Sequence, residues 1–243
     1  MRATIKDVSR TAGVSIKTVS RVLNNERYVG AATAERVRAA IAALQFRPSL
    51  AARSLAGRRS HQIALICDNP SPWYVFEMQT GIRDRCEAAG VRMIAQPWDR
   101  GADRLGDDIA ALLDTTQADG VVLTPPASDR ADVLEMLDGR GVRYVRVSPG
   151  VRFDASPATL IDNAGAAHAM TRRLLDLGHR RIGWVEGHPD YAASAQRAAG
   201  VARALREAGI APDPALVAPG RYDFASGEAA GAAMLALDRK SVV

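Results

Sequence analysis

The segment from residue 16 to residue 23 carries two kinds of side chain on opposite sides. At about 100° per residue along a helix, Val19, Val22 and Leu23 lie together on one apolar side. The other side is built from four residues, Ile16, Lys17, Ser20 and Arg21. An apolar side of this kind packs against other helices. The basic side is therefore free to meet a polyanion such as DNA.

Two further helices are predicted around this segment. Thr4 is a suitable N-cap for a first helix with Asp7 at its third position, Gly13 ends that helix, and Ser15 caps the second. A third helix is expected at 31–44. Three short helices with a glycine turn between the first two are typical of a helix-turn-helix fold, whose second helix enters the major groove. On composition alone, a three-helix surface cap with merely solvated arginines remains an alternative.

Charge is distributed unevenly along the chain of 243 residues. Residues 1–60 hold twelve Lys or Arg against three Asp or Glu, a net charge of +9, whereas the remainder has a net charge of −4. A basic segment that also contains periodic apolar residues indicates a folded polyanion-binding module rather than a disordered tail.

The run from Thr4 to Asn24 reads TIKDVSRTAGVSIKTVSRVLN and resembles the headpiece of the LacI/GalR family of bacterial repressors. The family pattern is TIxDVAxxAGVSxxTVSRVLN, and Ser9 stands where alanine is more usual. The resemblance implies that three residues read base edges, namely Ile16, Lys17 and Arg21. It implies that five residues mainly hold phosphates, namely Thr4, Ser15, Thr18, Ser20 and Asn24.

These side chains have the chemistry that the implied roles need. An arginine can bond both O6 and N7 of a guanine, a lysine can reach the same acceptors, and an isoleucine offers only apolar contact, such as with a thymine methyl group. Phosphate contacts set the register on DNA without reading its sequence. The two sets of residues are therefore expected to respond differently to mutation.

Residues 49–60 join this headpiece to the rest of the chain. By itself the segment is consistent with an ordinary exposed connector. The family pattern, matched by Ala52, Leu55, Ala56 and Gly57, instead implies a hinge helix that orders only when two subunits lie together on DNA. In that arrangement Leu55 wedges into the minor groove. An isolated helical turn is unstable in water, so the hinge would depend on both the partner subunit and the DNA.

From residue 63 onward, strand-like and helix-like runs alternate, which favours parallel sheets flanked by helices. Strands are predicted at residues 63–67, 91–96, 120–124, 142–147 and 181–185, with a weaker strand at 215–219. Helices are predicted at residues 80–89, 103–113, 130–137, 164–177, 194–208 and 225–237. Ligands of such folds bind at the carboxyl ends of the strands.

A second stretch, LLDLGHRRIG at 174–183, resembles the LxxLGHxxI pattern of the same family, and Ser194, Arg197 and Gly200 match its SxxRxxG pattern. The resemblance implies an all-α helix-turn-helix headpiece at 1–48 and a hinge and linker at 49–60. It also implies an α/β sensing domain of the periplasmic-binding-protein type, with Rossmann-like lobes at 61–161 and 162–243.

The resemblance further implies that the second lobe is truncated, so that the chain is a fragment. Family members run on by roughly a hundred residues, about half of such a domain. Residues 238–243 do not resemble the family, and we expect them not to be natural sequence. Effector binding by a chain with this ending is an open point at the level of the sequence.

In relatives a small-molecule effector lies in the cleft between the two lobes. The expected contacts are Ser194, Arg197 and Tyr222 on one wall, Asn69, Trp73 and Thr124 on the other, and Arg146. An aromatic ring beside an arginine suits a sugar. Relatives often have an acid near Arg146, so an arginine there leaves room for an acidic or phosphorylated effector. Alternatively, Arg197 pairs with a carboxylate, and Trp73 and Tyr222 are packing residues.

Signatures of enzymes and of membrane proteins are missing from the sequence. No GxGxxG follows the first predicted strand, and there is no P-loop, GxSxG or HExxH. Cys67 and Cys86 lack metal-ligand spacing. No apolar run is long enough to span a bilayer, and no export signal begins the chain. We therefore expect no catalysis, cofactor, metal or membrane partner, and a cytoplasmic location.

Together these features predict a sequence-specific DNA-binding transcriptional regulator, a repressor controlled by a small-molecule effector such as a sugar. A homodimer is expected to bind a pseudo-palindromic double-stranded operator. The alternative is a sugar-binding transport protein with the same sensing fold, which the basic headpiece and the lack of an export signal disfavour. An α/β enzyme acting on a sugar would need a metal or nucleophile cluster that the sequence does not offer.

Overall fold

The computed structural model describes residues 3–24, 26, 28–46, 59–98 and 104–239 of the chain. The chain divides into two compact units, Met1–Ser60 and His61–Val243. The finer boundaries after residues 48 and 161 remain predictions, and the hinge segment with Leu55 lies outside the described residues.

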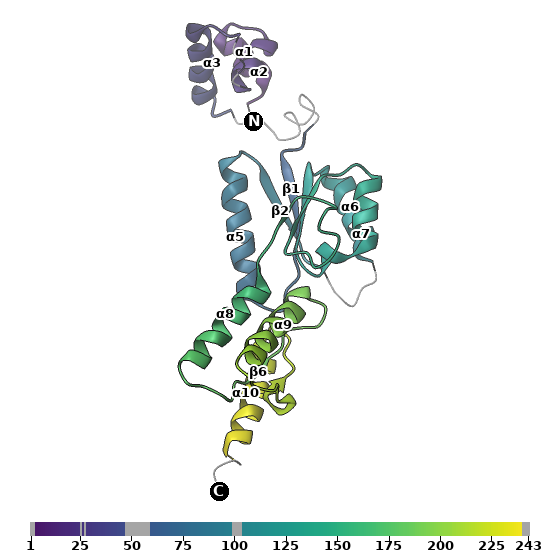
Figure 1. Cartoon of the computed structure of the whole chain (residues 1–243). Helices are drawn as coiled ribbons and strands as arrows, with labels where there is room; N and C mark the ends of the chain where they lie inside the picture. Colours follow the sequence, from purple (N-terminus) through teal and green to yellow (C-terminus); the bar gives the residue numbers. More distant parts are fainter. Residues whose placement is uncertain (1–2, 25, 27, 47–58, 99–103, 240–243) are drawn as a thin grey trace. The chain divides into compact units, whose positions relative to one another are not determined.

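The described residues of the first unit form three helices, α1 (Ile5–Ala12), α2 (Ile16–Leu23) and α3 (Ala31–Ala43) (Figure 1). The predicted capping of α1 is confirmed. The Asp7 backbone N–H donates to Thr4 Oγ1 at 3.4 Å, and the Thr4 backbone N–H donates to Asp7 Oδ2 at 2.9 Å. These bonds satisfy amide groups that the first turn of a helix leaves without intrahelical partners.

A small apolar core holds the three helices of the first unit together. Its buried members come from every helix and are Val8, Ala12, Val19, Val22, Ala34, Val37 and Ala40. Gly13, with φ of 64°, provides the left-handed turn between α1 and α2. Because Val19 and Val22 are buried in this core, α2 is fixed with its opposite side outward, as predicted.

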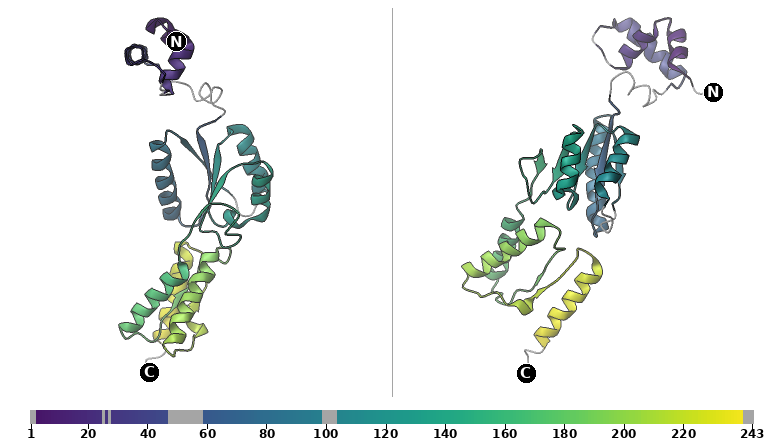
Figure 2. Two further views of the ribbon diagram at one scale, coloured as in Figure 1. Left: turned by 45° about the horizontal axis from the view of Figure 1, so that its top comes forward. Right: turned by 90° about the vertical axis from the view of Figure 1, so that its right-hand side faces the viewer.

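The second unit begins with a parallel sheet of five strands in the order β2-β1-β3-β4-β5. The strands are β1 (Gln62–Ile66), β2 (Arg92–Gln96), β3 (Gly120–Leu123), β4 (Tyr144–Val147) and β5 (Ala158–Thr159). Helix α5 (Pro72–Ala88) covers one face, and α6 (Leu105–Thr116) and α7 (Ala131–Gly139) cover the other (Figure 2). We call this part the first lobe.

The largest apolar core lies between the first-lobe sheet and helices α6 and α7. Its fully buried members include Ile66, Leu123, Ile109 and Leu134. The central strands β1 and β3 are buried over most of their length, which explains the continuous apolar runs that predict them. A short 3₁₀ helix, η1 (Ala127–Asp129), connects β3 to α7.

The second lobe follows in the same unit and has a two-stranded parallel sheet, β6 (Trp184–Val185) with β7 (Val217–Ala218). Its helices are α8 (Asn163–Asp176), α9 (Ala192–Glu207) and α10 (Phe224–Arg239), with a 3₁₀ helix η2 (Pro214–Leu216) before β7. Leu175, Val201 and Leu205 form a buried cluster between α8 and α9. The fold is thus a helical headpiece followed by an α/β domain.

Three details of the second unit differ from the sequence-based expectations. Helix α5 begins at Pro72 rather than near residue 80, because proline is well accommodated in the first turn of a helix and Ser71 caps it. The strand predicted at 181–185 is paired only over Trp184 and Val185, because β7 itself is two residues long. The equally short β5 was not predicted, since two residues carry too little alternation to be recognised.

The described part of the chain contains no helix that is both long and apolar enough to cross a membrane. Within the same residues, no group of three or more His, Cys, Asp or Glu side chains is arranged to hold a metal ion.

Candidate nucleic-acid interface and ligand pocket

Helix α2 presents the residues predicted to read bases on its exposed side. Ile16 is 44% exposed although it is a large apolar residue, and Lys17 is exposed beside it. The Thr18 backbone N–H donates to Ser15 Oγ at 3.1 Å, which caps the helix. An exposed isoleucine at the first turn of a capped helix is available for contact with a partner, whereas Val19 on the opposite side is fully buried.

Arg21 is held near the same face by a weak ion pair. Its Nε lies 3.6 Å from Glu26 Oε2, and the two side chains are 40% and 45% exposed. An ion pair this exposed contributes about 0–1 kcal/mol. The guanidinium can therefore leave Glu26 for a stronger, bidentate acceptor such as the O6 and N7 of a guanine.

The predicted phosphate contacts gather at helix ends. Thr4 and Ser15 are the N-caps of α1 and α2, and Asn24 is the C-cap of α2. Thr18 and Ser20 are half-buried, and the hydroxyl oxygens of Ser15 and Thr18 lie 2.9 Å apart. Helix N-termini attract anions because their first amide groups point outward. The phosphate roles remain predictions, as does the role of Leu55.

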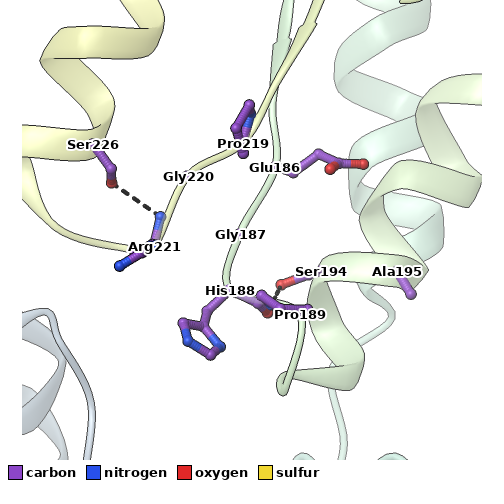
Figure 3. Close-up of a pocket in the computed structure, with 10 residues that line it drawn as sticks. All are labelled: Glu186, Gly187, His188, Pro189, Ser194, Ala195, Pro219, Gly220, Arg221 and Ser226. Carbon is purple, nitrogen blue, oxygen red and sulfur yellow. Dashed lines mark hydrogen bonds between the residues drawn. The ribbon is translucent and has the colours of Figure 1, made fainter.

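A cavity of about 740 Å³ opens at the carboxyl ends of β6 and β7, where ligands of α/β folds bind. Its walls come from the loops after the two strands and from the first turns of α9 and α10 (Figure 3). The lining residues are Glu186, Gly187, His188, Pro189, Ser194, Ala195, Pro219, Gly220, Arg221 and Ser226. We call this cavity the strand-end pocket. Its size is in the range of small-molecule sites.

Hydrogen bonds fix one wall of the strand-end pocket. Ser194 Oγ donates to the His188 carbonyl oxygen at 2.8 Å and lies 2.7 Å from the Tyr222 hydroxyl oxygen. Since the Ser194 proton is committed to His188, Tyr222 donates to Ser194. A Cβ on Gly187 would lie 2.2 Å from Tyr222 Cζ, so only glycine lets the tyrosine approach this closely. The wall is therefore preorganised.

Charged and polar groups of both signs border the same pocket. Glu186 and Arg221 are exposed at the ends of β6 and β7, and His188 Nδ1 lies 3.6 Å from Asp190 Oδ2. The Arg221 backbone N–H donates to Ser226 Oγ at 3.0 Å. The pocket thus offers hydroxyl groups, carbonyl groups and both charge signs, a set that suits a polar, hydroxyl-bearing molecule better than an apolar one.

The predicted effector residues Ser194 and Tyr222 meet in this wall, whereas Arg197 lies elsewhere. Arg197 lines a second, more apolar cavity of about 270 Å³ between α8, α9 and β6. Its Nε donates to Asn163 Oδ1 at 3.0 Å, so this hydrogen bond goes to an amide rather than to a carboxylate. Whether Arg197 contacts an effector remains a prediction.

Arg146, the seventh predicted effector contact, lies inside the first lobe, and its contact with an effector remains a prediction. Arg146 is fully buried, and its guanidinium donates to Ser156 Oγ and to the carbonyl oxygens of Ser128, Val151 and Arg152. The sequence showed a cation at a strand end, but the following loop folds back over it. The acidic or phosphorylated effector inferred from this arginine therefore also remains a prediction.

The other three predicted contacts belong to the first lobe. Thr124 is fully buried, and its hydroxyl donates to the Ile66 carbonyl oxygen at 3.2 Å. Asn69 Oδ1 accepts a hydrogen bond from the Ser71 backbone N–H at 2.9 Å. Trp73 is 71% exposed, with its ring centroid 5.8 Å from that of Phe76. None of the three lines either cavity described above.

Comparison with known proteins matches both units of the chain. The family "Bacterial regulatory proteins, lacI family" matches residues 4–49. The family "Periplasmic binding proteins and sugar binding domain of LacI family" matches residues 60–238, most of the chain. The chain belongs to the LacI family.

Similar members of the LacI family are regulators. The transcriptional regulator CelR of Thermobifida fusca is 35% identical over 240 residues, covering 94% of this chain and 68% of that protein. The transcriptional repressor PurR of Vibrio atlanticus (strain LGP32) is 33% identical over 228 residues, covering 91% of this chain and 66% of that protein. This LacI-family chain thus spans about two thirds of the length of such relatives.

Two solved structures resemble the chain in fold. A transcriptional regulator CelR-cellobiose complex has a TM-score of 0.63 and 31% identity, covering 96% of this chain and 70% of that one. A lac repressor dimer bound to operator and the anti-inducer ONPF has a TM-score of 0.79, covering 98% and 71%. Its identity of 24% makes it a likeness of fold alone. The predicted family and fold are therefore confirmed.

Sequence reasoning missed several residues of the strand-end pocket in this LacI-family chain. Glu186 and His188 follow β6 directly, and Arg221 follows β7. The rule that ligands bind at the carboxyl ends of parallel strands could have found them. Each strand is only two residues long, so the sequence pattern does not show where it ends.

Proposed function

We propose that this chain is the DNA-binding and effector-sensing part of a sequence-specific transcriptional regulator, a repressor controlled by a small molecule. The observation that carries the proposal is the two-sided α2. Its buried valines fix it to a unit whose residues 1–60 have a net charge of +9, while Ile16, Lys17 and Arg21 point outward. Relatives with the same two units are named as regulators and repressors.

The partner is double-stranded operator DNA. Basic residues of the headpiece attract the phosphates and set the register, and Lys17 and Arg21 discriminate bases in the major groove. Two copies of the chain on a pseudo-palindromic site give one headpiece per half-site. This role places the protein with the DNA in the bacterial cytoplasm and requires no catalytic group.

The effector is a polar small molecule, with a sugar as the first candidate class. The hydroxyl groups of Ser194 and Ser226 and the ring of His188 border the strand-end pocket and can bond hydroxyl groups of a ligand. One similar solved structure is a complex of the transcriptional regulator CelR with cellobiose. Cellobiose is therefore the first compound to test.

DNA binding is tested by fluorescence anisotropy of the purified chain with a symmetric site selected from a random pool and with random duplex DNA, across a salt series. The regulator is expected to prefer the selected site by roughly a thousandfold or more, and its affinity for both duplexes is expected to fall steeply with salt. Equal, weak affinity for the two duplexes at every salt concentration would contradict the proposal.

Effector binding is tested by thermal unfolding with cellobiose and with a panel of mono- and disaccharides. A bound sugar at about one hundred times its Kd stabilises the protein by about 2.7 kcal/mol. Ser194→Leu, which fills the wall and removes its hydroxyl, is the matched control and should abolish the shift. A shift that survives Ser194→Leu would place the sugar outside the strand-end pocket.

A further inference from the structure

Tyr191 connects the second lobe to the first. It precedes α9, is only 4% exposed, and donates its hydroxyl hydrogen bond to the Asp68 carbonyl oxygen at 3.1 Å. Asp68 lies 123 residues earlier in the chain, two residues after the end of β1. A buried tyrosine hydroxyl almost always takes a hydrogen-bond partner, and here the partner belongs to the other lobe.

The ring of Tyr191 contacts the wall of the strand-end pocket. Its centroid lies 5.3 Å from that of Tyr222 at an interplanar angle of 84°, and 6.0 Å from that of His188 at 78°. Both are the edge-to-face geometry that aromatic pairs prefer. The rings of His188, Tyr191 and Tyr222 therefore form one packed cluster. This cluster borders the pocket, because His188 lines it and Tyr222 bonds Ser194 in its wall.

The start of α9 touches the first lobe at a second point. A Cβ on Gly150 would lie 2.2 Å from the Ala192 Cβ, so the two backbones are in close contact. Gly150 is itself fixed, since its N–H donates to Asp129 Oδ1 at 2.9 Å and to Oδ2 at 3.0 Å. The start of α9 therefore meets the first lobe through the close approach at Gly150 and through the hydrogen bond from Tyr191 to Asp68.

The segment after Asp68 can carry a displacement to helix α5. The Ser71 backbone N–H donates to Asn69 Oδ1 at 2.9 Å, and Ser71 Oγ accepts from the Tyr74 backbone N–H at 3.4 Å. These bonds make residues 68–71 a short, ordered link between β1 and the first turn of α5. A displacement of the Asp68 carbonyl group is therefore transmitted to α5 and is not taken up by a flexible loop.

We propose that Tyr191 is a positioning residue that couples the wall of the strand-end pocket to the first lobe. Its hydroxyl holds Asp68, and its ring is held by His188 and Tyr222. An occupant of the pocket that moves either ring changes whether the hydroxyl reaches Asp68, and with it the angle between the lobes. This inference rests on the proposed sensing function and names the residue through which sensing is transmitted.

The link is tested on the whole chain by the distance between the lobes. Spin labels are attached at Glu135→Cys on α7 and Arg206→Cys on α9, two exposed positions, and their separation is measured by pulsed electron paramagnetic resonance. Labelling of the native Cys67 and Cys86, which are buried, is checked by mass spectrometry. Tyr191→Phe retains the ring and removes only the hydroxyl, and it is expected to broaden the distance distribution.

Tyr144→Phe is the matched control. Tyr144 is a buried tyrosine whose hydroxyl donates to Asp138 Oδ1 at 3.0 Å, inside the first lobe. The Tyr144→Phe variant also loses a tyrosine hydroxyl group, but this group is not at the contact between the lobes. Its distance distribution should therefore equal that of the unmodified chain. A distribution unchanged by Tyr191→Phe, or changed equally by both variants, would overturn the assignment.

Coupling to the pocket is tested by His188→Ala with and without Tyr191→Phe. The single His188 variant should broaden the distance distribution, because the Tyr191 ring loses one of its supports. In the Tyr191→Phe background it should add no further change. Equal effects in both backgrounds would show that the pocket wall acts on the lobes independently of Tyr191. Neither measurement involves DNA or a sugar, so failure here is distinguishable from failure of the proposed function.

Discussion

Among single residues, Arg21 has the clearest expected effect. Arg21→Ala removes the side chain proposed to bond a guanine and should cost about 1–3 kcal/mol on the selected operator, with relaxed specificity at one base pair. On random DNA the loss should be small. The measurement is fluorescence anisotropy with a set of operator DNAs, each of which is changed at one base pair. Because the ion pair with Glu26 is weak and exposed, folding should be unaffected.

Arg38→Ala is the control for Arg21. Arg38 on α3 is also exposed and paired with a carboxylate, with 3.2 Å between its Nη1 and Glu35 Oε2. The Arg38→Ala variant also loses one positive charge, so any fall in DNA affinity should be the same for all DNA sequences. Loss of discrimination in Arg38→Ala, or equal losses on operator and random DNA in Arg21→Ala, would count against the assigned roles.

Arg146 is expected to stabilise the first lobe through its buried hydrogen bonds. Arg146→Met keeps most of the volume but leaves the carbonyl oxygens of Ser128, Val151 and Arg152 without their buried donor. An unsatisfied buried acceptor costs about 1–3 kcal/mol, so the free energy of unfolding should fall by at least about 2 kcal/mol. Urea unfolding followed by tryptophan fluorescence measures it.

Arg140→Met provides the comparison for Arg146. Arg140 Nη1 lies 2.7 Å from Asp114 Oδ1, but the two side chains are 38% and 65% exposed. Removing an exposed ion pair of this kind should change the free energy of unfolding little. If Arg146→Met and Arg140→Met have the same free energy of unfolding, the buried hydrogen bonds of Arg146 contribute no more to stability than an exposed ion pair does.

Among the elements, α8 and α9 depend on a close approach at Gly200. A Cβ there would lie 2.2 Å from the Ala164 carbonyl oxygen and 3.0 Å from the His168 backbone nitrogen, atoms that cannot move independently of α8. Gly200→Ala should therefore lower the free energy of unfolding by about 1–3 kcal/mol. Gly231→Ala, in α10 with nothing within 4 Å, should instead raise it by about 0.5–1 kcal/mol. Thermal unfolding distinguishes the opposite signs.

Helix α1 is expected to weaken in acid through its cap. Hydrogen bonds from the Thr4 hydroxyl and then from the Thr4 backbone N–H lower the pKa of the Asp7 carboxyl below 3.8. A carboxyl whose pKa is lowered by folding stabilises the fold above its unfolded pKa, and this stabilisation is lost as the pH falls through the folded value. The Asp7 carboxylate should therefore stabilise α1 above pH 3.8, and this stabilisation should be lost progressively as the pH falls below 3.8.

The measurement is hydrogen-exchange protection of the α1 amides between about pH 5 and about pH 2.5. Asp7→Asn removes the titrating group, so its protection should change less over the same range. Identical pH dependence in the two proteins would mean that other carboxylates, and not the Asp7 cap, control the acid lability of α1.

For the whole molecule, the separate cores of the two units predict independent local stability. Val37→Ala cuts into the headpiece core and Leu137→Ala into the first-lobe core, each at a fully buried position. Each should speed hydrogen exchange across its own unit, with a cost of about 2 kcal/mol or more, and leave the other unit's protection unchanged. Exchange that rises in both units for either variant would show that they unfold together.

The sequence by itself determined the headpiece and the family. The caps Thr4 and Ser15 and the two-sided pattern of α2 are local properties, because hydrogen bonds within a few residues and the helical period decide them. Strands β1 to β4 were also recognisable from their apolar residues, whereas β5 is too short to show a pattern. Two distant motif runs then specified the LacI family.

Only the tertiary structure decided which side chains face the pocket. Arg146 and Thr124 stand at strand ends, yet contacts with residues far along the chain enclose both of them. Ser194 and Tyr222 meet because a glycine at position 187 allows the approach, and Tyr191 finds Asp68 in the other lobe. Such contacts depend on how separate elements pack and where each side chain then points, and no local pattern of residues encodes that.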